Sequence, residues 1–92
     1  AKKRATCSLY HEAKDLSRVG EINIIYNQKS QIKIKITDVR IARFCDIDET
    51  WAIKEYYLSL EYWRQVHNAF FKNIKPDFNE TDVLELNEFV VL

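Results

Sequence analysis

Hydrophobic and polar residues alternate along two stretches in the first half of this 92-residue chain. Residues 21–26 place Ile22, Ile24 and Tyr26 on one face, and residues 31–37 carry isoleucine at every second position. A period of two is typical of half-buried β-strands, and the polar residues between the two stretches predict a hairpin turn. The first clear strand is therefore expected directly after Gly20.

The alternation changes phase further along the second stretch. The isoleucines of residues 31–37 stand at even positions, whereas Val39 and Ile41 stand at odd positions. Such a shift moves apolar side chains to the other face of a regular strand, so the backbone must bulge or bend where it occurs. We expect this irregularity at residues 37–38, and a bend there would let a small sheet curl towards a barrel.

The pattern becomes helical after Phe44. Asp46 or Asp48 can cap a first helix, and Ser59 can cap a second helix that Pro76 brings to an end. The second helix carries a wide apolar stripe that we expect to pack across the open side of the sheet. The stripe consists of Leu60, Trp63, His67, Phe70, Phe71 and Ile74.

The chain closes with residues 83–92, in which the β-branched and aromatic run 89–92 predicts a buried strand. A chain of this length forms one domain, and its five Phe, five Tyr and two Trp can supply a sufficient core. The order of elements predicts a small α+β fold with a mostly antiparallel, strongly bent sheet and two packed helices.

The two cysteines, Cys7 and Cys45, are too few for a disulfide framework and have no second ligand at zinc spacing. We interpret them as reduced thiols, with a single bridge between them as the less favoured alternative. The sequence indicates no metal or cofactor. It has neither a signal peptide pattern nor an apolar run of the roughly 18 residues that a membrane span needs, so a cytoplasmic protein is expected.

A formal net charge of zero conceals a polarised chain. Residues 1–43 contain ten basic and four acidic residues, a net charge of +6, and residues 44–92 contain four and ten, a net charge of −6. The two halves could neutralise each other in the fold, or the basic half could form a binding face for phosphate. The charge distribution favours neither mutual neutralisation nor a binding face over the other.

The densest positive charge lies in the opening segment, residues 2–9. Lys2, Lys3 and Arg4 stand directly before a threonine, a cysteine and a serine, all of which can act as nucleophiles. Fixed positive charge suits an anionic ligand such as a nucleotide, while a lysine crowded by other cations can lose its proton near neutral pH. The segment is therefore compatible with both binding and catalysis.

Four segments together resemble one known family: residues 2–9, the strand end 36–44, the first helix 52–55, and residues 58–71 with their paired phenylalanines. They are similar to the activating-signal-cointegrator homology (ASCH) domain over nearly the whole chain. The resemblance implies a β-barrel like that of pseudouridine synthases and archaeosine transglycosylases (PUA-like), and an association with RNA and nucleoside chemistry. We expect a single domain over residues 1–92, in which the N-terminal helix and strand of related sequences are missing.

The resemblance also implies a catalytic set. In some small ASCH-like proteins, a lysine of the opening motif, a threonine three residues later and a glutamate of the first helix are proposed to hydrolyse the amide of an N4-acetylated cytidine. By position these are Lys3, Thr6 and Glu55. Related sequences follow the glutamate with a glycine-rich turn, whereas Tyr56 and Tyr57 stand here. Their rings could close the cleft or stack on a base.

Three functions remain open from the sequence. The first is an RNA or nucleoside binding domain whose ligand lies in a basic cleft between the opening segment and the first helix; the second is the amidohydrolase; the third is a domain that binds a protein through its acidic second half. The first is preferred because it needs only the charge pattern and the fold. Its expected basic residues are Lys2, Lys3, Arg4, Lys33, Lys35, Arg40 and Arg43.

Overall fold

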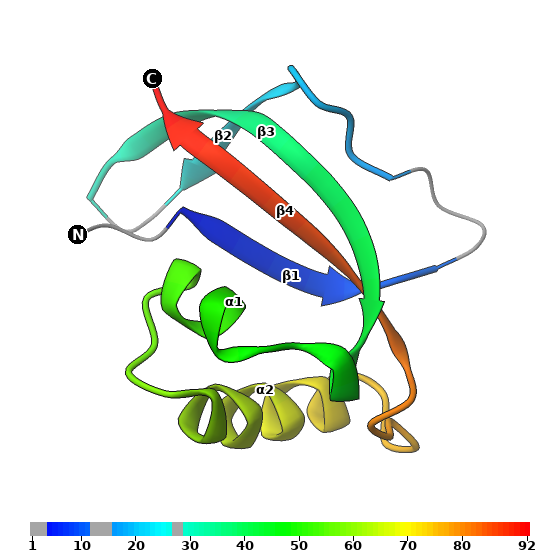
Figure 1. The fold of residues 1–92 in the computed structure, drawn as a ribbon. Coiled ribbons are helices and arrows are strands. Elements are labelled where there is room, and N and C mark those ends of the chain that lie inside the picture. Colours follow the sequence, from blue (N-terminus) through cyan, green and yellow to red (C-terminus); the bar gives the residue numbers. More distant parts are fainter. Residues whose placement is uncertain (1–3, 12–15, 27–28) are drawn as a thin grey trace.

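A curled four-stranded sheet with two helices at one end makes up the fold (Figure 1). The computed structural model describes residues 4–11, 16–26 and 29–92. The strands are antiparallel in the order β1-β4-β3-β2, which forms a half-barrel and confirms the predicted α+β class. The elements are β1 (Ala5–Leu9), β2 (Ile22–Tyr26), β3 (Gln31–Arg43), a 3₁₀ helix (Phe44–Asp46), α1 (Glu49–Lys54), α2 (Leu60–Ile74) and β4 (Val83–Val91).

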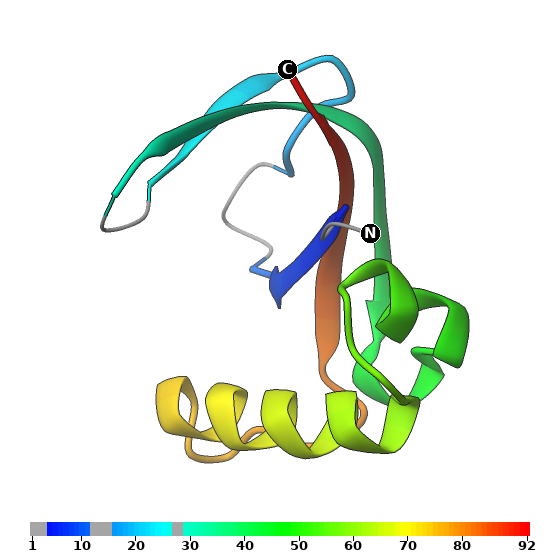
Figure 2. The same ribbon diagram turned by 90° about the vertical axis from the view of Figure 1, so that its left-hand side faces the viewer.

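The long strand β3 bends the sheet. Its first half pairs with β2, it pairs with β4 from Ile34 onward, and the register shifts between Ile36 and Asp38. This shift confirms the irregularity predicted at residues 37–38, because one extra residue there lets the apolar side chains before and after it face the same way. Figure 2 shows the resulting arch, with the β2–β3 hairpin at one end and the helices below the other.

Residues 5–9 of the opening segment form a strand, β1, which the sequence pattern did not predict. β1 pairs with β4 over five positions, from Ala5 opposite Glu88 to Leu9 opposite Leu84. Apart from Thr6 its residues are neither β-branched nor aromatic, and the segment carries no clear alternation of its own. The central strand β4 instead supplies its hydrogen-bonding partners, and β1 forms an edge of the sheet.

The buried part of β4 lies earlier than the sequence indicated. Residues 84–87 and Phe89 are buried, whereas Val90, Val91 and Leu92 are about half exposed or more. The buried stretch runs between β1 and β3, while the last residues pair with β3 alone. The expectation of a buried run 89–92 was therefore wrong, because burial follows the neighbouring strands more closely than β-propensity.

The face of β2 that carries Ile22, Ile24 and Tyr26 is exposed. Asn23 lies opposite the buried Ile34, so Asn23 and Ile25 face the inside of the half-barrel. The inner face packs Ile34, Ile36 and Phe89 into a small apolar cluster with Val39. The larger core lies between the sheet and the helices and contains Ala5, Phe44, Ile47, Trp51, Ala52, Trp63, Phe71, Phe78, Leu84 and Leu86.

Both helices begin at the caps that the sequence offers. The Asp48 side chain accepts a hydrogen bond from the Trp51 N–H at 2.9 Å, and the Ser59 hydroxyl accepts one from the Tyr62 N–H at 3.1 Å. α2 buries Trp63, His67 and Phe71 of its stripe, while Phe70 and Ile74 are more than half exposed and line a hollow of about 330 Å³. None of the described helices is long and apolar enough to cross a membrane.

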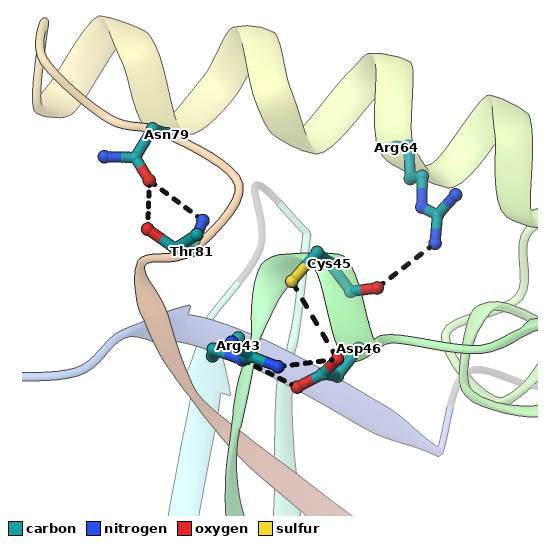
Figure 3. A network of polar contacts seen from close by, with 6 residues as sticks. All are labelled: Arg43, Cys45, Asp46, Arg64, Asn79 and Thr81. Atoms are coloured by element: carbon teal, nitrogen blue, oxygen red, sulfur yellow. Dashed lines mark hydrogen bonds and ion pairs between the residues drawn. The ribbon is translucent and has the colours of Figure 1, made fainter.

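A polar network fixes the turn between β3 and α1 (Figure 3). Arg43 binds Asp46 through Nε and Oδ2 at 2.9 Å, and the Arg64 guanidinium of α2 donates to the Cys45 carbonyl at 3.5 Å. The hydrogen bond from Arg43 lowers the pKa of Asp46 below its ordinary value. Cys45 and Cys7 are both reduced, so no bridge joins them. The network holds the 3₁₀ helix against α2.

The end of α1 is a Schellman turn, in which the last carbonyls of a helix accept from the two residues beyond its cap. The Tyr57 N–H donates to the Ala52 carbonyl and the Tyr56 N–H to the Ile53 carbonyl, both at 2.9 Å. Tyr56 takes a φ of +71°, the left-handed conformation that favours glycine. Glu55 is the cap residue, so the turn directs the chain away immediately after it.

Replacing Tyr56 by Gly is expected to stabilise the protein by about 0.5–1 kcal/mol, because glycine removes the steric cost of a Cβ at positive φ. The Tyr56 side chain is 65% exposed, so little packing is lost. Urea unfolding measures the difference. Tyr56→Ala is the matched control, since it shortens the side chain but keeps the Cβ. Equal stability of the glycine and alanine variants would show that the backbone is not strained.

Candidate functional site

Two backbone hydrogen bonds bring the end of α1 next to the start of β1. The Arg4 N–H donates to the Lys54 carbonyl at 3.1 Å, and the Arg4 carbonyl accepts from the Phe89 N–H of β4 at 2.9 Å. Successive side chains of a strand point to opposite faces, yet Thr6 and Cys7 of this edge strand both line the space beside the end of α1. A cavity of about 240 Å³ lies there, lined by Thr6, Cys7, Glu55, Tyr57, Val66, His67 and Phe70.

The carboxylate of Glu55 lies inside the core, where only 2% of the residue is exposed. Its Oε2 accepts hydrogen bonds from the indole N–H groups of Trp51, at 2.5 Å, and Trp63, at 3.1 Å. Trp51 precedes Glu55 by one helical turn in α1, and Trp63 lies in α2. The two donors fix the orientation of the carboxylate, and they turn Oε1 towards His67.

His67 occupies the other side of the carboxylate. Its Nε2 lies 3.5 Å from Glu55 Oε1, and its Nδ1 lies 2.9 Å from the Trp63 carbonyl oxygen. A carbonyl oxygen only accepts, so Nδ1 carries a proton and donates it. Nε2 then presents either a lone pair or the second proton of an imidazolium to the cavity. The ring stacks on Trp63 at 4.3 Å and meets the edge of Tyr57 at 5.2 Å.

The pKa values of Glu55 and Tyr57, the two titratable groups beside His67, are shifted in opposite directions. Burial alone would raise the pKa of Glu55, but the hydrogen bond and charge of His67 and the two indole donors outweigh it, and the pKa is lowered. The pKa of Tyr57 is raised, mainly because its phenol is withdrawn from water and then because Glu55 is near. At neutral pH the cavity therefore contains an ionised carboxylate beside a neutral phenol.

A second cavity, of about 430 Å³, lies inside the half-barrel. Thr6 lines both cavities, so it stands where they meet. The walls of the second cavity combine four apolar side chains with three further polar ones besides Thr6. These are Ile25, Ile34, Ile36 and Phe89, and Ser17, Asn23 and Asn87.

Asn87 has a fixed amide orientation in the wall of this second cavity. Its Nδ2 donates to Glu85 Oε2 at 3.0 Å, and the reversed amide would place Oδ1 against that carboxylate oxygen without a hydrogen bond. Its Oδ1 is buried and accepts no hydrogen bond from any residue that the structure describes. A buried acceptor without a donor costs about 1–3 kcal/mol and is rare in folded proteins.

Of the predicted catalytic set, the structure brings Thr6 and Glu55 to one cavity. Lys3 lies outside the described residues, as does Lys2 of the predicted basic cleft. Arg4 is exposed at the start of β1, next to the end of α1. Arg4 of the opening segment therefore adjoins the first helix, and the basic cleft between them stays a prediction.

The other predicted basic residues lie elsewhere. Lys33 and Lys35 are exposed on the outer face of β3, because they alternate with Ile34 and Ile36, which line the inner cavity. Arg40 faces the helices: its guanidinium lies 5.5 Å from the ring centre of Trp51 and pairs with Asp38 at 3.0 Å and Glu88 at 3.6 Å. Arg43 pairs with Asp46.

Comparison with known proteins settles the family. The family model of the ASCH domain matches residues 1–92. The chain belongs to the ASCH domain family. A crystal structure of an ASCH domain from Lactobacillus crispatus JV V101 is 29% identical in sequence, with a TM-score of 0.88 over 97% of this chain and 64% of that chain. A protein from Enterococcus faecalis V583 is 30% identical, with a TM-score of 0.87 over 98% of this chain and 61% of that chain.

This ASCH domain therefore spans less than two thirds of the length of those two solved chains. No curated protein matches it. The PUA-like fold of the family is generally linked to RNA binding.

Several residues of the ASCH domain site carried no sequence signal that we interpreted as functional. His67 was predicted as a member of the apolar stripe; it is a buried, hydrogen-bonded histidine of α2, and it also faces Glu55. The four-residue spacings from Trp51 to Glu55 and from Trp63 to His67 could have indicated that each pair shares a helix face. Asn87 gave no signal, because a polar residue in a strand usually faces solvent.

Replacing Glu55 by Ala is expected to destabilise the ASCH domain by about 2–4 kcal/mol at pH 7. The change leaves two indole N–H groups buried without an acceptor, and each such group costs about 1–3 kcal/mol. Urea unfolding measures the loss. Glu61→Ala, at an exposed position in the first turn of α2, is the control and should change stability by no more than about 0.5 kcal/mol.

The stability gap between wild type and the Glu55→Ala variant should also narrow in acid. The folded pKa of Glu55 is lowered, so its carboxylate stabilises the fold above the unfolded pKa of about 4.3. That contribution is lost as the pH falls through the lower, folded pKa. A gap that stays constant from pH 7 down to pH 3 would contradict the role of the ionised form.

Proposed function

We propose that this ASCH domain binds RNA or a nucleoside, with one base held in the 430 Å³ cavity inside the half-barrel. The observation that supports this most is the buried Oδ1 of Asn87, which no described residue satisfies. A ligand N–H group would supply the missing hydrogen bond, and nucleobases carry such donors on their edges. Small movements of the side chains in the cavity wall would bring the ligand N–H group and the Asn87 Oδ1 within hydrogen-bonding distance.

The composition of the cavity fits a nucleobase in other respects. Its volume lies within the range of small-molecule sites, roughly 300–1,000 Å³. The Phe89 ring and three isoleucines offer an apolar surface to the faces of a flat heterocycle. Thr6, Ser17 and Asn23 add polar groups that can recognise its edges or the ribose. The combination of an apolar wall with a few polar groups is typical of sites that bind one class of ligand.

Phosphate contacts are proposed for the opening segment. Arg4 is exposed next to the end of α1, its carbonyl accepts from the Phe89 N–H of β4, and it stands two residues before Thr6. A cation there could hold the backbone of an RNA whose base enters the cavity. Lys33 and Lys35, on the outer face of β3, would contact only an RNA long enough to pass around the sheet.

Replacing Asn87 by Ala is expected to weaken binding of a labelled single-stranded RNA about tenfold, since one hydrogen bond in a buried site contributes about 1–1.5 kcal/mol. Fluorescence anisotropy at two salt concentrations measures the affinity, and urea unfolding verifies the fold. With an RNA too short to pass around the sheet, Lys35→Ala is the control and should leave the affinity unchanged, because Lys35 lies on the outer face of β3. Equal RNA affinity of the Asn87→Ala variant and wild type would contradict the proposed base site.

Amide hydrolysis is a second candidate, and one observation favours it: Thr6 and Glu55 line the same 240 Å³ cavity. In the proposed reaction the Thr6 oxygen bonds to the acetyl carbon of N4-acetylcytidine, the C–N bond breaks, and the hydroxyl proton leaves on the amine of cytidine. Water then cleaves the acetyl ester and releases acetate. The amino group of Lys3 would accept the threonine proton, and Glu55 would hold that amino group in place.

Purified wild-type protein is expected to release acetate from N4-acetylcytidine, and Thr6→Ala is expected to reduce the rate at least about 100-fold. Thr6→Ser keeps a hydroxyl and should retain most of the activity. Chromatography of cytidine and acetate against time measures the rate. Inactive wild-type protein would rule out the reaction but leave the proposed RNA binding intact, because that proposal depends on Asn87.

A further inference from the structure

Cys7, Glu55 and His67 each direct one potential metal-binding atom into the same small volume, and these three atoms lie within 4.8 Å of one another. Glu55 and His67 are buried and Cys7 is half-buried. We propose that the three side chains bind one divalent ion of the zinc type. This proposal is independent of the proposed RNA binding, which involves the other cavity.

The surroundings already orient two of the three side chains as metal ligands are usually oriented. Such a histidine normally donates its other ring N–H to a carbonyl or carboxylate, as His67 Nδ1 does to the Trp63 carbonyl at 2.9 Å. Its Nε2 is thereby turned towards Glu55 and can present a lone pair. The carboxylate of Glu55 is held through Oε2 by Trp51 and Trp63, which directs Oε1 towards His67.

The distances between the three ligand atoms are close to those of a zinc site. In a tetrahedral zinc site, with metal to ligand distances of about 2.0–2.3 Å, neighbouring ligand atoms lie about 3.3–3.6 Å apart. His67 Nε2 and Glu55 Oε1 are 3.5 Å apart and meet this value. The thiol of Cys7 would have to approach by at most about 1.3 Å. A turn about its Cα–Cβ bond can provide such a shift.

The chemistry of the donors selects the ion. A thiolate and a carboxylate together carry two negative charges, which a divalent cation neutralises in a site largely removed from water. A set of sulfur, nitrogen and oxygen suits zinc and related transition metals, whereas magnesium and calcium prefer oxygen alone. Three protein ligands leave a fourth position, which would face the cavity lined by Thr6 and Tyr57. An ion there would engage Glu55 and compete with its proposed role in amide hydrolysis.

Titration of chelator-treated protein with Co²⁺ and Zn²⁺ tests the proposal. One equivalent of Co²⁺ is expected to produce the near-ultraviolet absorption of a cobalt–thiolate bond together with the visible bands of a four-coordinate ion, and Zn²⁺ should displace it. A chromophoric chelator in competition gives the Zn²⁺ affinity. Bound Zn²⁺ should also slow alkylation of Cys7, which mass spectrometry distinguishes from alkylation of Cys45.

Cys7→Ser is expected to abolish the thiolate band and to lower the Zn²⁺ affinity at least about tenfold, since even outer-shell changes cost 10–100-fold. Cys45→Ser is the matched control, because Cys45 lies in the 3₁₀ helix and is not one of the three proposed ligands. This variant should leave the thiolate band and the Zn²⁺ affinity unchanged. Folding of each variant is verified by circular dichroism. The proposal would be overturned by the absence of a 1:1 complex in the wild type, by unchanged affinity in Cys7→Ser, or by a thiolate band that disappears in Cys45→Ser.

Discussion

A buried carboxylate organises this ASCH domain. Glu55 accepts hydrogen bonds from the indoles of Trp51 and Trp63 and faces the imidazole of His67, so α1 and α2 are joined by polar contacts in the middle of an aromatic core. An ionised group in such a position is tolerated only when several donors surround it. The donors that keep Glu55 in the core also fix the direction of its second oxygen, and that oxygen faces the cavity at the edge of β1.

The position of β1 connects this cluster to the inside of the half-barrel. Arg4 is bound on one side to the end of α1 and on the other to β4, and two residues later Thr6 lines both the helix-side cavity and the cavity inside the sheet. Two chemically different spaces therefore meet at one strand. The first is rich in titratable groups. The second combines four apolar with four polar side chains, among them Asn87, whose buried Oδ1 accepts no hydrogen bond from the described part of the chain. This division is the physical basis for assigning base recognition to one and metal binding or hydrolysis to the other.

In the folded chain, some residues of the basic half form ion pairs and others remain exposed. Arg40 pairs with Glu88 and Arg43 pairs with Asp46, so part of the basic half is neutralised by the acidic half. Lys33 and Lys35 remain exposed, but on the face of the sheet away from the inner cavity. Of the described cations in the predicted set, Arg4 lies nearest to Thr6 in the chain, two residues before it.

Much of the architecture could be predicted from local sequence. The isoleucine alternation and its change of phase located β3 and its bulge, and Asp48, Ser59 and Pro76 marked the helix limits, because strand period, capping and proline geometry act over a few residues. The pairing of β1 could not be predicted, since its residues show no clear alternation and the distant strand β4 supplies their hydrogen-bonding partners. The candidate site likewise was predictable only in part. Family resemblance indicated Thr6 and Glu55, but the convergence of Cys7 and His67 on Glu55, and the burial of Asn87, depend on contacts between elements far apart in the chain, which only the tertiary structure decides.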